Sequence, residues 1–110
     1  MILISLIVNI LVLIPVIGGL LANSTWAVSA YGPQTQARGI LLSIYGAILF
    51  ASVALLFIWD PRMIAALLAV QVIYKVTTPF TVGTFKNPVV ISNLSIAALH
   101  SITMMVIWAM

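Results

Sequence analysis

The sequence contains no cysteine and very few ionisable side chains. The missing cysteines exclude disulfides, Cys-x-x-Cys redox chemistry, iron–sulfur clusters and covalent haem attachment. Charged residues make up 5% of the chain, and Asp60 is the only acidic one. A soluble domain of 110 residues would need a polar shell larger than its core. The available charges cannot supply that shell.

Basic residues are also scarce, and they are not clustered. The net charge of +3 comes from cations spread over separate segments, at Arg38, Arg62, Lys75 and Lys86. A nucleic-acid surface normally carries a basic stripe on one face. We therefore expect no nucleic-acid partner.

Apolar residues, in contrast, are abundant at 65% of the chain. They form four segments that predict helices over residues 2–22, 38–59, 61–82 and 88–110. About 20 apolar residues are enough to cross the hydrocarbon core of a bilayer. The first segment could instead be a signal peptide, but no Lys or Arg precedes it and its apolar part is long for one. We predict an all-α fold, an integral membrane four-helix antiparallel bundle, with one transmembrane domain over residues 1–110.

The connections suggest how these helices are arranged. The segment Asn23–Ala37 is rich in Asn, Ser, Thr, Gly and Gln, which predicts a loop on the membrane surface. The turn at Asp60-Pro61-Arg62 is short enough to force antiparallel neighbours. Both termini then lie on the face that carries this turn. Arg38 and Lys86 lie on the opposite face, which the positive-inside rule places in the cytoplasm by a small margin.

Lys75 is the one cation within an apolar segment, and its depth depends on where the third helix ends. If this helix stops near Thr78, Lys75 is close to the membrane surface, and its methylene chain is long enough to place the ammonium there. If the helix continues past Pro79 to about Val82, Lys75 is deeper and needs a partner. No acidic residue is available at that depth, because Asp60 lies at the opposite end of the helix. The first geometry, a lysine that anchors the helix at the surface, is the leading expectation.

His100 is the only histidine and falls about halfway along the last predicted helix. We expect a neutral imidazole, buried among the helices and hydrogen-bonded to Asn93, a Ser hydroxyl or a backbone carbonyl. No second histidine, cysteine or intramembrane carboxylate is present to complete a metal site. A Ser-His-Asp triad is not expected either, since Asp60 is far from His100 in depth. The sequence therefore predicts no catalytic residue, no metal and no cofactor.

Each predicted helix has one weakly polar face. These faces carry Ser5 and Asn9, Tyr45 and Ser52, Gln71 and Lys75, and Asn93 and His100. They can hold the helices together, or they can surround a small amphipathic ligand. The candidate ligand-binding residues are Gln71, Tyr74, Lys75, Asn93 and His100. Small side chains, which allow close approach of helices in lipid, mark candidate packing faces at Ser43, Ala47, Ala51, Ala65 and Ala69.

Arg38 opens the second predicted helix, and Gln71, Tyr74 and Lys75 form a Gln-x-x-Tyr-Lys patch in the third. In these patches and in topology the chain resembles the DoxX-like small four-helix proteins of bacterial membranes. The resemblance implies an accessory role beside larger respiratory or oxidoreductase complexes and no catalytic residue. The small multidrug resistance transporters share the size, but they depend on a glutamate in the first helix, which is absent here. The four-helix quinone-linked disulfide-forming enzymes need cysteine pairs.

The sequence favours a non-catalytic membrane subunit that packs in and stabilises a larger membrane protein complex, most simply in the bacterial inner membrane. Its positive support is the small-residue faces, together with the absence of any catalytic constellation. The alternative is a small carrier or a lipid- or quinone-binding protein that uses the polar faces around Lys75 and His100.

Overall fold

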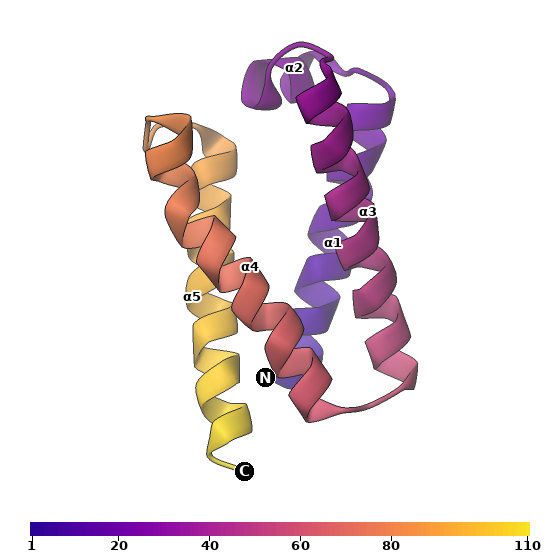
Figure 1. Ribbon diagram of the computed structural model, residues 1–110, viewed down its shortest axis with the longest axis vertical. Coiled ribbons are helices and arrows are strands. Elements are labelled where there is room, and N and C mark those ends of the chain that lie inside the picture. The colour runs from indigo at the N-terminus through magenta and orange to yellow at the C-terminus, as the bar shows by residue number, and fades with distance from the viewer.

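A computed structural model describes all 110 residues and contains only helices and their connections (Figure 1). Four helices are long: α1 (Ile2–Leu21), α3 (Gln36–Phe57), α4 (Pro61–Val82) and α5 (Pro88–Trp108). The short helix α2 (Thr25–Tyr31) connects α1 to α3. Each of the four long helices is long and apolar enough to cross a membrane. The all-α class is confirmed, with five helices where the sequence predicted four.

Helix α2 corrects the prediction of a loop over Asn23–Ala37. Its residues have modest helix propensity, but the segment buries apolar side chains that a surface loop would expose. Ala27 is fully buried in an apolar cluster with Leu20 and Tyr45. The ring of Trp26 lies directly over Gly19 of α1, where a methyl group would overlap it. Tertiary packing therefore outweighs the local preference for a loop.

This contact predicts a position-specific effect of adding one methyl group. Gly19→Ala should push Trp26 and α2 away from α1 and cost about 1–3 kcal/mol, the usual range for overpacking. Gly18→Ala is the matched control, because open space surrounds that position. Thermal unfolding in detergent and tryptophan fluorescence measure both effects. Equal behaviour of the two variants would show that Trp26 does not occupy this place.

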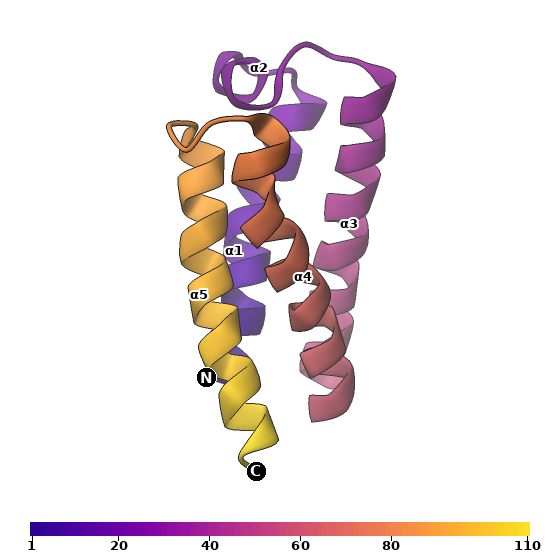
Figure 2. The same cartoon turned by 60° about the vertical axis from the view of Figure 1, so that its left-hand side comes forward.

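The long helices are arranged as two closely packed pairs, α1 with α3 and α4 with α5 (Figures 1 and 2). Smaller contacts of α1 with α5 and of α3 with α4 join the pairs. Helix α2 and the turn between α4 and α5 lie at one end, called the α2 end here, and both chain termini lie toward the other (Figure 1). The longest dimension is 43 Å, about the thickness of a bilayer with its headgroups.

Helix α4 continues through Pro79 to Val82, in agreement with the predicted range 61–82, so of the two geometries considered for Lys75 the one with a helix end near Thr78 does not occur. The threonines stay helical because their hydroxyls bond back to the preceding turn: Thr78 Oγ1 donates to the carbonyl of Tyr74. The helix ends only at Gly83, whose left-handed φ of 86° closes the last turn by a bond from its N–H to the Pro79 carbonyl. Because α4 ends four residues after Thr78, Lys75 is roughly 6 Å further from the helix end than an end at Thr78 would have placed it.

Polar side chains face inward and large apolar ones face outward. The buried polar or charged residues are Ser5, Asn9, Arg38, Ser52, Gln71, Lys75, Asn93, His100 and Thr103. The outer faces carry side chains such as Phe50, Phe57 and Phe80, each at least 75% exposed. Water would penalise so much exposed apolar surface, whereas lipid would not.

The small-residue faces separate into two groups. Ala65 is buried in the apolar cluster near the termini, and Ala51 and Ala69 are half-buried. Ser43 and Ala47 are exposed on the outer face of α3. Within this chain, the expected close approach at Ser43 and Ala47 therefore does not occur.

Candidate functional site

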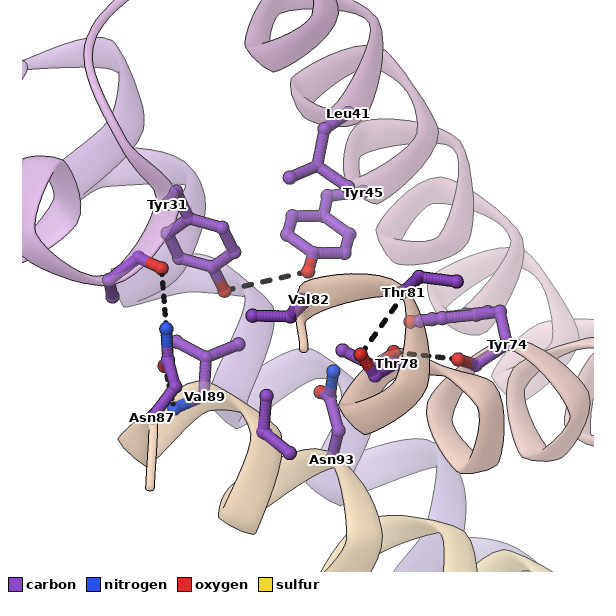
Figure 3. A pocket seen from close by; sticks show the side chains of 12 residues that line it. Tyr31, Leu41, Tyr45, Tyr74, Thr78, Thr81, Val82, Asn87, Val89 and Asn93 are labelled. Atoms are coloured by element: carbon purple, nitrogen blue, oxygen red, sulfur yellow. Dashed lines mark hydrogen bonds between the residues drawn. The ribbon is translucent and has the colours of Figure 1, made fainter. Parts of the chain in front are cut away.

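A cavity of about 350 Å³ lies between the two helix pairs at the α2 end (Figure 3). Tyrosines 31, 45 and 74 bring their hydroxyls toward it from α2, α3 and α4, and Asn93 reaches it from α5. We call it the tyrosine cavity. The remaining lining is largely apolar: Ala30, Leu41, Thr78, Thr81, Val82, Asn87, Val89 and Val90. An apolar wall with a few convergent polar groups is typical of small-molecule sites.

Two of the tyrosines form a pair on one wall. The rings of Tyr31 and Tyr45 meet edge to face with centroids 6.0 Å apart. The Tyr45 hydroxyl approaches the Tyr31 hydroxyl at 3.5 Å. Burial, assisted by Tyr45, raises the pKa of the Tyr31 phenol. Tyr31 therefore remains protonated near neutral pH and can donate a hydrogen bond.

Lys75 and Asn93 occupy a smaller space of about 20 Å³ that shares Tyr31, Tyr45 and Tyr74 with the tyrosine cavity. Both residues are more than nine-tenths buried. The Lys75 ammonium makes no ion pair or hydrogen bond within the chain, and its nearest favourable contact is the Tyr74 ring, 5.5 Å from Nζ to the centroid. The Asn93 amide likewise has no hydrogen-bond partner in the chain. Unpartnered donors therefore gather in this small space beside the tyrosine cavity.

His100 belongs to a separate set of side chains, which we call the polar network: Ser5, Asn9, Ser52, His100 and Thr103. Its Nε2 lies 2.8 Å from Asn9 Oδ1, and its Nδ1 lies 3.0 Å from Ser5 Oγ. Asn9 Nδ2 donates to Ser52 Oγ at 3.2 Å. Because Asn9 Oδ1 can only accept, Nε2 donates and a neutral ring leaves Nδ1 to accept from Ser5. The network joins α1, α3 and α5.

The order Ser5, His100, Asn9 resembles a nucleophile, a base and an orienting residue. Ser5 and His100 are fully buried, however, and neither lines a cavity described above. The polar network therefore acts as a contact between helices, with a Ser hydroxyl as one of the partners expected for His100.

The structure thus divides the residues predicted to bind a ligand. Tyr74, Lys75 and Asn93 line the same small space beside the tyrosine cavity, whereas His100 lies in the polar network. Gln71 is buried but faces neither group, and its amide approaches only the carbonyl of Leu67 in its own helix, at 3.5 Å. Sequence reasoning missed Tyr31, which lies in the segment predicted as a surface loop, and used Tyr45 only as part of a polar face.

Comparisons of the chain with known protein families, with curated proteins and with solved structures found no match.

Proposed function

We propose that this chain is an integral membrane protein that binds a small amphipathic molecule in the tyrosine cavity. The observation that carries the proposal is that unpartnered Asn93 lines the apolar tyrosine cavity, and that unpartnered Lys75 lines the small space beside it, which shares Asn93 and three tyrosines with the cavity. No fully buried side-chain polar atom lacks a partner, so the unpartnered polar atoms of Lys75 and Asn93 keep some accessible surface, where a bound molecule can meet them. The inward polar and outward apolar side chains support the membrane setting.

The positions of the charged residues favour one orientation of the chain in the membrane, and the resemblance favours one type of membrane. Arg38 and Lys86 lie near the α2 end and Arg62 near the other, so we place the α2 end in the cytoplasm. The similarity to DoxX-like proteins favours the bacterial inner membrane. In this setting the cavity would lie in the cytoplasmic half of the bilayer.

Filling the cavity tests the proposal. Ala30→Phe places a ring in the space that Ala30 lines and should weaken binding of a long-chain amphiphile about tenfold or more, which corresponds to 1.4 kcal/mol. Ser29→Phe is the matched control, since Ser29 is the neighbouring residue and is exposed. Native mass spectrometry with added hexadecanol reads out occupancy. Equal occupancy of the two variants would contradict binding in this cavity.

A second candidate is the accessory subunit of a larger membrane complex, and the exposed Ser43 and Ala47 on α3 favour it. Small side chains on an outer face allow a second helix to approach closely in lipid. Native mass spectrometry after gentle extraction tests this role. A heteromer of fixed stoichiometry would support it, and a monodisperse monomer would count against it.

A further inference from the structure

We propose that the tyrosine cavity selects an amphiphile with a single negative charge at its head, a long-chain carboxylate. This inference rests on the proposed function and specifies the ligand class for the same site. It is carried by the buried, unpaired ammonium of Lys75 beside donors that also lack partners.

The first step concerns the charge of Lys75. A cation at this depth is costly unless it is paired or hydrated. The ring of Tyr74 supplies a weak cation–π contact, and the chain offers no anion nearby, because Asp60 caps the start of α4 at the opposite end. A ligand carboxylate in the cavity would supply the missing counter-charge and a charge-assisted hydrogen bond.

The second step concerns the number of charges. Lys75 is the one cation at the cavity, because the guanidinium of Arg38 is bound to the carbonyls of Leu20 and Gly32. A single negative charge balances it. A neutral alcohol or quinone would leave the ammonium unpaired, and a dianionic phosphate would leave one charge without a partner.

The third step concerns hydrogen bonding around the head. A carboxylate accepts several hydrogen bonds and donates none. The hydroxyl of Tyr74 and the amide of Asn93 line the same small space as Lys75 and are available as donors. Tyr31 adds a phenol that stays protonated. These polar groups can therefore all donate hydrogen bonds to a head group that only accepts them.

The fourth step concerns the tail. Beside the small space that Lys75 lines, the tyrosine cavity has a largely apolar lining that includes Leu41 of α3 and Val82 of α4 (Figure 3). Its volume of about 350 Å³ is near the lower limit for ligand sites. A single chain suits that volume better than a two-chain phospholipid, so the carboxylate source we propose is a free long-chain acid.

The test compares matched ligands by native mass spectrometry of the detergent-solubilised protein. Hexadecanoic acid should bind about tenfold more tightly than hexadecanol. Lys75→Met should abolish this preference, Lys75→Arg should retain most of it, and Arg62→Met, an exposed cation at the other end, should leave it unchanged. Melting temperatures close to that of the unaltered protein would show that the variants fold.

Each result has a separate meaning. Equal binding of acid and alcohol would overturn the head-group inference and leave the proposed function standing. A preference that survives Lys75→Met would overturn the role of Lys75. Tighter binding of phosphatidylserine than of the free acid would overturn the single-chain source. Failure of both single-chain ligands to bind would overturn the proposed function itself.

Discussion

His100→Leu should lower the free energy of unfolding by about 2–3 kcal/mol, because it leaves buried polar groups without partners. Leucine has a similar size, so the packing volume is nearly retained. The substitution removes the donor to Asn9 Oδ1 and one of the two side-chain partners of the Ser5 hydroxyl, which keeps Thr103 Oγ1 at 2.7 Å. Lipid provides no water to replace them. Equilibrium unfolding of the detergent-solubilised protein, titrated with a denaturing detergent, measures the loss.

A double variant separates the network from simple packing. Asn9→Leu combined with His100→Leu should cost less than the sum of the single changes, because two apolar partners leave fewer unpaired groups. Ser95→Ala is the control on the same helix, since this exposed hydroxyl bonds only to the carbonyl of Ile91. It should change the stability by less than about 0.5 kcal/mol. A loss from His100→Leu no larger than that of the control would contradict a stabilising role for the polar network.

The sequence predicts the long helices well because their signal is local. About 20 apolar residues, bounded by a turn such as Asp60-Pro61-Arg62, define a helix without reference to its neighbours. Helix α2 could not be predicted in this way, because it depends on Trp26 lying over Gly19 and on the burial of Ala27. The end of α4 agrees with the predicted range 61–82, but the depth of Lys75 stayed open because proline and threonine are poor helix formers in water, whereas a membrane setting favours internal hydrogen bonds.

The site is harder to predict than the fold, because a helical pattern gives the face of a residue and not its partner. Asn93 and His100 share a face of α5, but seven residues separate them, about 10 Å along the helix. His100 therefore contacts Ser5 and Asn9 of α1. Asn93 instead lines the small space beside the tyrosine cavity, together with Val12 and Val16 of α1. One predicted polar face thus contributes to two different environments.

The largest effect of a single substitution is expected at Arg38, which ties three helices together at the α2 end. Its Nη2 donates to the carbonyl of Leu20 in the last turn of α1, and its Nη1 donates to the carbonyl of Gly32 after α2, both at 3.0 Å. The side chain is 5% exposed. A cation at the end of α1 also interacts favourably with that helix dipole.

Arg38→Met should therefore cost about 3 kcal/mol or more, because each hydrogen bond from a charged donor contributes about 1.5–3 kcal/mol and both are lost. Arg38→Lys should recover only part of this, since one ammonium lacks the fork that serves two carbonyls. Arg62→Met is the control, a cation that is exposed at the opposite end and should be nearly neutral. Hydrogen exchange locates the effect: the amides of α2 should lose protection in Arg38→Met while those of α5 keep it. Unchanged protection in α2 would mean that Ala27 and Trp26 hold this helix in place without the arginine.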